Sequence, residues 1–157
     1  MSERIAFVGV GRMGANMARH LKLDCGREVT AVYDLDQEAA GTLAAELGAR
    51  NCETLAEVSA AADIILTVVT NDAAMRAIFL GEGDGLLGAA AGKTFINCAT
   101  LSPGIHREVY EAGKAAGADV MEGAMASSIS HAREGKLYLM VGGDEECFNR
   151  HRALLED

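Results

Sequence analysis

Apolar residues in this sequence fall into short unbroken runs that alternate with stripes at helical spacing. Near the amino terminus the apolar run Ile5 to Val8 leads into three glycines, Gly9-x-Gly11-x-x-Gly14, and an apolar stripe at helical spacing follows. This order predicts a strand, a tight turn and a helix from about Arg12 to Leu23. The run Glu28 to Tyr33 then predicts a second strand.

The same alternation continues along the chain. Further strands are predicted near residues 49–52, 63–69, 94–98 and 118–121, and Lys136 to Val141 is typical of a strand at a sheet edge. Helices are predicted to begin at Asp36, at the capping-box spacing Thr54-x-x-Glu57, at Asn71-Asp72, at Ser102-Pro103 and at Asp144. The run Asp63 to Val69 lacks polar alternation, as expected of a strand buried on both faces. Strands and helices that alternate in this way predict an α/β fold.

The glycine turn carries the main candidate chemistry. In such a turn the first glycine permits the bend, the second lets backbone approach a pyrophosphate, and the third lets helix and strand pack closely. The start of the helix also offers bare N–H groups to an anion. Three glycines alone are weak evidence, because Gly83-Asp84-Gly85-Leu86-Leu87-Gly88 has the same spacing. That second copy follows a helical pattern and no amphipathic helix follows it, so we expect a loop there.

Asp34 distinguishes the glycine pattern at Gly9 to Gly14 from the pattern at Gly83 to Gly88. It ends the predicted second strand 20 residues beyond Gly14, where an acid that accepts hydrogen bonds from an adenosine ribose is expected. The alternative is a turn residue, with Asp36 as the N-cap of the next helix. Strand, turn, helix, strand and acid together favour dinucleotide binding. They predict a Rossmann-type fold: a doubly wound, mostly parallel sheet with helices on both faces and an extra edge strand.

The composition is that of one globular domain over residues 1–157, long enough to bury a full core. Hydrophobic residues make up 50% of the sequence and charged residues 24%. The formal net charge of −9 argues against nucleic acid or an anionic membrane as the partner, so the expected ligand is a small molecule. No apolar stretch approaches the length of a membrane span, and no secretion signal precedes the first strand.

The cysteines point to a reducing compartment. They lie far apart, with no C-x-x-C and no Cys/His cluster of metal spacing: Cys25, Cys52, Cys98 and Cys147. Reduced, mostly buried thiols in a cytoplasmic protein are therefore expected, and no metal site.

Two more loops are candidates because each follows a predicted strand, and parallel sheets bind ligands at the carboxyl ends of their strands. The polar side chains of Thr70-Asn71-Asp72 either pack against a nucleotide or cap the next helix. Thr100 ends the later loop just before Ser102-Pro103, which is typical of a helix start, and has no capping duty of its own.

Taken together, these segments resemble the nucleotide-binding domain of the β-hydroxyacid dehydrogenase family. That family includes 3-hydroxyisobutyrate, tartronate semialdehyde and glyoxylate/succinic semialdehyde reductases and, more distantly, 6-phosphogluconate dehydrogenases and imine reductases. The matching positions run from Ile5 almost to Asp157. They include Phe7-Val8-Gly9-Val10-Gly11-Arg12-Met13-Gly14, Val69-Thr70-Asn71, Ala99-Thr100-Leu101-Ser102-Pro103 and Gly142-Gly143-Asp144-Glu145.

The resemblance implies hydride transfer between a nicotinamide cofactor and a small 3-hydroxyacid or semialdehyde. It implies cofactor binding by Gly9, Val10, Gly11, Arg12, Met13, Gly14, Asp34, Val69, Thr70, Asn71 and Thr100. NAD rather than NADP is expected, because Asp34 would repel a 2′-phosphate. Leu35 also stands where an NADP enzyme would often carry arginine.

The chain departs from the family pattern at the substrate motif. The family's Asp-Ala-Pro-Val-Ser-Gly-Gly falls on Glu122 to Ser128, so that Ala126 replaces the hydroxyl that usually touches the substrate. The resemblance places substrate binding at Ala126, Ser127 and Ser128, and a solvated turn is the alternative.

A second departure concerns catalysis. The family's catalytic lysine lies on a following all-helical domain, which is expected to be absent from this chain, so no catalytic residue is expected within residues 1–157. The chain alone is then expected to be inactive, and the whole protein to form a homo-oligomer through that domain. Two alternatives stay open: an imine-reductase-like enzyme, which Gly123-Ala124-Met125 favours, and a non-catalytic dinucleotide-sensing or interaction module.

Overall fold

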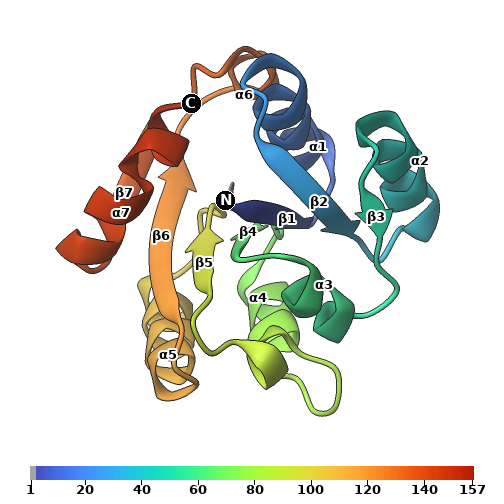
Figure 1. Cartoon of the computed structure of the whole chain (residues 1–157). Coiled ribbons are helices and arrows are strands. Elements are labelled where there is room, and N and C mark those ends of the chain that lie inside the picture. The colour runs from blue at the N-terminus through green and yellow to red at the C-terminus, as the bar shows by residue number, and fades with distance from the viewer. Residues whose placement is uncertain (1–2) are drawn as a thin grey trace.

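The computed structural model describes residues 3–157 and shows one seven-stranded sheet in the order β3-β2-β1-β4-β5-β6-β7 (Figure 1). The strands are β1 (Arg4–Val8), β2 (Glu28–Tyr33), β3 (Arg50–Asn51), β4 (Ile64–Thr67), β5 (Thr94–Asn97), β6 (Asp119–Met125) and β7 (Leu139–Gly142). All neighbouring pairs are parallel except β6 and β7. The expected doubly wound, Rossmann-type α/β fold is confirmed.

Helices cover both faces of the sheet. They are α1 (Arg12–Arg19), α2 (Gln37–Leu47), α3 (Leu55–Ala61), α4 (Asp72–Leu80), α5 (Pro103–Ala115), α6 (Ile129–Glu134) and α7 (Glu145–Glu156). Buried side chains of α1, α2, α6 and α7 pack in one core on one face, and those of α3, α4 and α5 pack in a second core on the other. In Figure 1, α1, α2 and α6 lie above the strands, and α3, α4 and α5 lie below them.

The central strands are apolar because both of their faces are covered. Every residue of β4 and of β5 is buried, and so is Ile5 to Val8 in β1. Phe95 on β5 meets Phe79 on α4 edge to face, with ring centroids 5.2 Å apart. A side-chain hydrogen bond joins β4 to β5, from Thr67 to Asn97, whose side-chain oxygens lie 2.7 Å apart. Strand order reverses at β1 and β4, so the ligand crevice of this fold lies outside their carboxyl ends.

The helix starts follow the predicted capping chemistry. Asp36 accepts from the N–H of Ala39, and Thr54 and Glu57 form the expected capping box. Ser102 caps α5 with Pro103 in its first turn. Gly48 ends α2 in the left-handed conformation, with φ of 65°.

Some predicted boundaries were wrong at the carboxyl-terminal end of the chain. Strand β6 runs on to Met125, because β7 pairs antiparallel with Glu122 to Met125. Strand β7 begins at Leu139, not Lys136, because Lys136 still closes the turn after α6 with a bond from its N–H to His131 O. The short helix α6 was not predicted, although Ser128 at its N-cap and Gly135 at its C-cap were visible signals.

The first helix also differs from its predicted form. Residues Arg12 to Arg19 are α-helical, but His20–Asp24 form a π-helical turn. Strand β3 covers only Arg50 and Asn51 of the predicted residues 49–52. Gly83 to Gly85 lie in a loop before a single 3-10 turn, Leu86–Ala89, which confirms the expectation for the second glycine copy.

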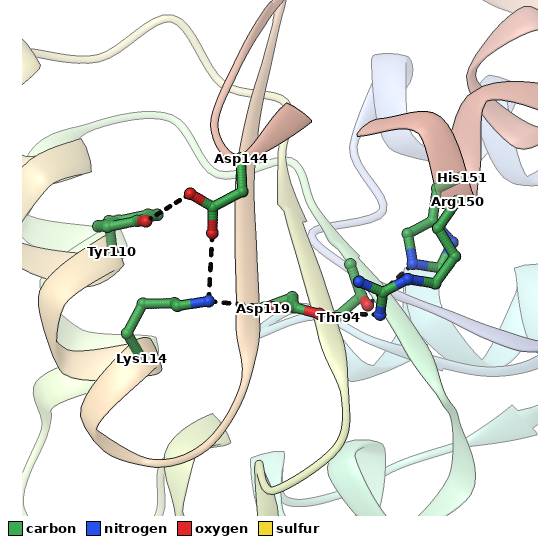
Figure 2. Close-up of polar contacts among 7 residues, drawn as sticks. All are labelled: Thr94, Tyr110, Lys114, Asp119, Asp144, Arg150 and His151. Atoms are coloured by element: carbon green, nitrogen blue, oxygen red, sulfur yellow. Dashed lines mark hydrogen bonds and ion pairs between the residues drawn. The ribbon is translucent and has the colours of Figure 1, made fainter. Parts of the chain in front are cut away.

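A polar network fastens α7 to the amino ends of β5 and β6, away from the crevice (Figure 2). The Tyr110 hydroxyl and the Lys114 ammonium both donate to Asp144, the residue that precedes α7. Lys114 and Arg150 both bind Asp119 on β6, and His151 bonds to Thr94 on β5. Hydrogen bonds from Tyr110 and Lys114 lower the pKa of Asp144. Each of these bonds joins one secondary structure element to another, so the network stabilises the packing of α5 and α7 against the sheet.

One ion pair gives a pH-dependent contribution to stability. Hydrogen bonds from Arg4 lower the pKa of Asp63 from 3.8 to about 2. The pair therefore stabilises the fold above about pH 4, and this contribution is lost as the pH falls towards 2. Because both side chains are more than 40% exposed, we expect Asp63→Asn to cost only about 0.5–1 kcal/mol at pH 7.

Urea unfolding at several pH values checks this prediction. The difference between Asp63→Asn and the parent should shrink between pH 4 and pH 2. The same difference at pH 2.5 as at pH 7 would contradict it. Glu156→Gln, in the exposed pair with Arg152, is the matched control and should leave stability unchanged at every pH.

Candidate functional site: a groove at the carboxyl ends of β1, β2 and β4

The glycine turn packs tightly against the end of β4. Gly9 has a φ of 90°, and its N–H donates to Tyr33 O at 2.9 Å. A Cβ at Gly9 would lie 2.3 Å from the backbone oxygen of Val68. A Cβ at Gly14 would lie 2.1 Å from the backbone oxygen of Gly9. These two glycines are therefore required by the packing of the turn itself.

Gly11 differs from the other two glycines. A Cβ there would meet no protein atom within 4 Å, and Gly11 is exposed. It is also the N-cap of α1, and no side chain caps this helix. The backbone N–H groups of the first turn thus face open space next to a residue without a side chain. This arrangement fits an anionic group that approaches the backbone closely.

Asp34 is fixed beside this turn by backbone donors. Its Oδ2 accepts from Val10 N at 2.8 Å and its Oδ1 from Asp36 N at 2.9 Å. Each carboxylate oxygen keeps a further lone pair. Asp34 is half-buried at the end of β2, so it can still accept hydrogen bonds from a ligand. The alternative interpretation placed Asp34 in a turn and Asp36 at the N-cap of α2. Asp36 does cap α2, and Asp34 also joins the glycine turn to β2.

A groove of about 510 Å³ brings several of the predicted residues together. Its lining includes Gly9, Gly11, Asp34, Val69 and Thr70. It also includes Leu35, which the sequence singled out as an argument for NAD, and residues that sequence reasoning missed, among them Tyr33, Leu55, Ala74, Ala77, Ile78 and Asp84. The glycine spacing at Gly83 and Gly85 was the available signal for Asp84, but it was assigned to a loop without a role.

The other predicted cofactor residues do not line this groove. Val10 supplies an N–H to Asp34, and Gly14 packs behind the turn, while Arg12 and Met13 begin α1. Asn71 caps α4 by accepting from Ala74 N at 2.8 Å, which is the capping alternative.

Thr100 lies in the exposed loop after β5. Its hydroxyl lies 3.5 Å from the backbone oxygen of Met125, at the end of β6. Nearby, Asp72 accepts from the N–H and the hydroxyl of Ser102, which joins the loops after β4 and β5. Hydrogen bonds from Ser102 lower the pKa of Asp72. Thr100 therefore stands at the carboxyl edge of the sheet, on a loop held in place by its neighbours.

The predicted substrate residues form the connection from β6 to α6. Ala126 N donates to Tyr138 O, and Ser127 Oγ accepts from Tyr138 N, both at 2.9 Å. Ser128 caps α6 and also bonds to Ser130. The three residues are exposed, and both hydroxyls already have a partner within the chain. This geometry fits the solvated-turn alternative as well as a substrate contact.

Three features define a dinucleotide-binding domain of the Rossmann type. The mostly parallel sheet reverses its strand order at β1 and β4, the glycine turn is open at the uncapped start of α1, and Asp34 is fixed at the end of β2. Residues 4–157 match the family model for the NAD binding domain of 6-phosphogluconate dehydrogenase, and the chain belongs to this family. It is a nicotinamide cofactor-binding domain.

The chain is also similar to individual enzymes of this kind. The chain is 35% identical over 154 residues to a 3-hydroxyisobutyrate dehydrogenase of Pseudomonas aeruginosa, which covers 98% of this chain and 50% of that protein. The structure of Mycobacterium tuberculosis 3-hydroxyisobutyrate dehydrogenase with L-serine superposes with a TM-score of 0.88 at 30% identity, over 99% of this chain and 52% of that one. An imine reductase from Bacillus cereus gives a TM-score of 0.84 at 25% identity, over 98% and 51%. The chain thus spans about half the length of these relatives.

Two further findings concern the described residues 3–157. No group of three or more His, Cys, Asp or Glu side chains there is arranged to hold a metal ion. None of the helices in this part of the chain is long and apolar enough to cross a bilayer.

All four cysteines are free, and Cys52, Cys98 and Cys147 are buried, as expected. Burial raises the pKa of the Cys98 thiol to about 12, so it stays protonated at neutral pH.

Proposed function

We propose that this chain is the cofactor-binding part of an oxidoreductase that transfers hydride between a nicotinamide cofactor and a small 3-hydroxyacid or semialdehyde. The observation that carries the proposal is the open position at Gly11, beside the uncapped start of α1 and in one groove with Asp34. The residues present fit a dinucleotide: Gly9 to Gly14 would hold the pyrophosphate and Asp34 the adenosine ribose.

NAD is the proposed cofactor rather than NADP. The Asp34 carboxylate is held towards the groove by Val10 and Asp36, where it would repel a 2′-phosphate. Leu35 beside it is 89% exposed and offers no positive charge to such a phosphate. Both features favour a free ribose hydroxyl, which can donate to Asp34.

The nicotinamide and the substrate are proposed to lie at the loops that follow β4, β5 and β6. When bound, the nicotinamide ring supplies or accepts the hydride. In this proposal Val69, Thr70, Asn71 and Thr100 flank the nicotinamide end, and Ala126, Ser127 and Ser128 lie at the substrate. No residue of this chain is proposed as catalytic.

We further propose that a following all-helical domain supplies the catalytic lysine and the contacts of a homo-oligomer. The relatives, about twice as long as this chain, support a second domain. A cytoplasmic location is proposed on the basis of the free cysteines.

Replacing Asp34 tests the cofactor assignment. We expect Asp34→Ala to lower NADH affinity by about tenfold or more, since a charged hydrogen-bond acceptor is lost, and to weaken NADPH binding much less. Calorimetric titration with each dinucleotide measures both affinities. NADH binding equal to that of the parent would contradict the assignment. Asp36→Ala, which removes a neighbouring carboxylate that does not line the groove, is the control for general damage.

A second candidate is an imine-reductase-like enzyme. It is supported by Gly123-Ala124-Met125 in the substrate motif and by the likeness to the Bacillus cereus imine reductase. Assays of the whole protein with cyclic imines and with 3-hydroxyacids would separate the two candidates. Turnover of a hydroxyacid without reduction of any cyclic imine would count against the second.

A further inference from the structure

Part of the groove's lining is apolar. Leu35 follows β2 by two residues, Leu55 begins α3 and Ile78 lies on α4, and all three line the groove. In the proposed function the pyrophosphate lies at Gly11 and the ribose at Asp34. The next part of a dinucleotide along this line is its adenine base, and a flat base fits between apolar side chains.

Besides Asp34, a second charged side chain, Asp84, lines the groove together with these apolar residues. It lies in the loop after α4, between Gly83 with a φ of 88° and Gly85, whose Cβ would lie 3.7 Å from backbone oxygens at the end of α4. A positive φ at Gly83 disfavours any other residue there. The turn at Gly83 therefore precedes Asp84 directly, and Asp84 lines the groove.

Asp84 is held in a fixed orientation by α3. Its Oδ2 accepts from Leu55 N at 2.8 Å and its Oδ1 from Ala56 N at 2.9 Å. These bonds satisfy two N–H groups at the start of α3 and leave one lone pair on each oxygen. Burial, followed by the charges of Asp84 and Asp34, raises the pKa of Tyr33, which lines the groove as well. Both carboxylates thus act on the same part of the groove.

A fixed carboxylate beside these apolar residues selects a base with an amino group at its edge. Adenine carries such a donor, its 6-amino group, whereas guanine and hypoxanthine present an oxygen acceptor at this position. We propose that Asp84 is a specificity-determining residue that accepts a hydrogen bond from the adenine 6-amino group of the dinucleotide. This inference rests on the proposed cofactor function and assigns a base-reading role to a loop outside the glycine turn and β2.

A double-mutant cycle between protein and ligand tests the inference. Calorimetry would compare NADH with its analogue that has purine in place of adenine and so lacks only the 6-amino group. The parent chain should bind the purine analogue about tenfold more weakly, because a hydrogen bond to a charged group is lost. Asp84→Asn keeps the shape and one capping oxygen but has no charge. We expect it to bind NADH more weakly and to discriminate between the two ligands by less than about twofold.

The control variant is Asp36→Asn, which changes an N-cap carboxylate of α2 that does not line the groove. It should keep the tenfold discrimination. If Asp84 acted only by capping α3, Asp84→Asn would weaken both ligands equally and leave the tenfold ratio unchanged, which would overturn the inference. A parent that binds NADH tightly but does not distinguish the analogue would also overturn it, while the proposed function would stand. A parent that binds neither ligand would overturn both.

Discussion

Replacing Gly11 by alanine is expected to lower NADH affinity by about 100-fold, equivalent to about 2.7 kcal/mol, while the N-cap change destabilises the fold by no more than about 1 kcal/mol. A Cβ at Gly11 meets no protein atom within 4 Å, so the folded chain accommodates it without strain. The same methyl group would occupy the space through which a pyrophosphate reaches the N–H groups of α1. Calorimetric titration with NADH measures the first effect, and thermal unfolding without ligand measures the second.

Gly88→Ala is the matched control for Gly11→Ala. Gly88 also has no atom within 4 Å of its would-be Cβ, and it belongs to the second glycine copy, which lies in a loop and a short turn. We expect its affinity for NADH to equal that of the parent. NADH binding by Gly11→Ala at parental strength would show that no ligand approaches this residue and would contradict the site.

Gly14→Ala, in contrast to Gly11→Ala, is expected to act on stability: its free energy of unfolding should fall by about 3 kcal/mol. A Cβ at Gly14 would lie 2.1 Å from the backbone oxygen of Gly9, and backbone on both sides leaves little room for either to move. For a chain of this length such a loss lowers the Tm by roughly 10 °C. Calorimetric or circular-dichroism melting without ligand measures it.

Gly104→Ala is the control for this second prediction, because Gly104 also lies in the first turn of a helix. Its Cβ would meet only the Ser102 hydroxyl oxygen, at 3.9 Å, so alanine should be neutral or slightly stabilising there. A Tm of Gly14→Ala within about 2 °C of the parent would show that the close contact between α1 and the turn can relax.

Local patterns predicted most of the fold because each part of the signal lay within a few residues. The apolar runs at Ile5 to Val8 and Ile64 to Leu66 are short and unbroken, and both lie in central strands and are buried. Helix starts at Asp36, Thr54 and Ser102 were set by side chains that cap their own backbone. Errors arose where pairing with a distant strand decided the outcome, as in β6, which extends to Met125 through its contacts with β7.

The candidate site was predictable where a motif contained its parts or where a loop followed a predicted strand, as at Val69 and Thr70. Gly9, Gly11 and Asp34 belong to a single β-α-β unit, and the structure brings them into one groove. Leu55 and Asp84 come from separate segments that meet through bonds between the Asp84 carboxylate and the start of α3. No spacing in the sequence encodes that contact. Thr100, Asn71 and the hydroxyls of Ser127 and Ser128 remain predictions as ligand contacts, since each also has a partner within the chain.

Calorimetric titration of this 157-residue chain with NADH, and separately with NADPH, shows whether the glycine turn and Asp34 bind the cofactor. We expect one NADH bound per chain, with NADPH at least tenfold weaker, because the Asp34 carboxylate would repel a 2′-phosphate. A chain that melts cooperatively yet binds neither dinucleotide would contradict the assignment of the glycine turn and Asp34 to the cofactor.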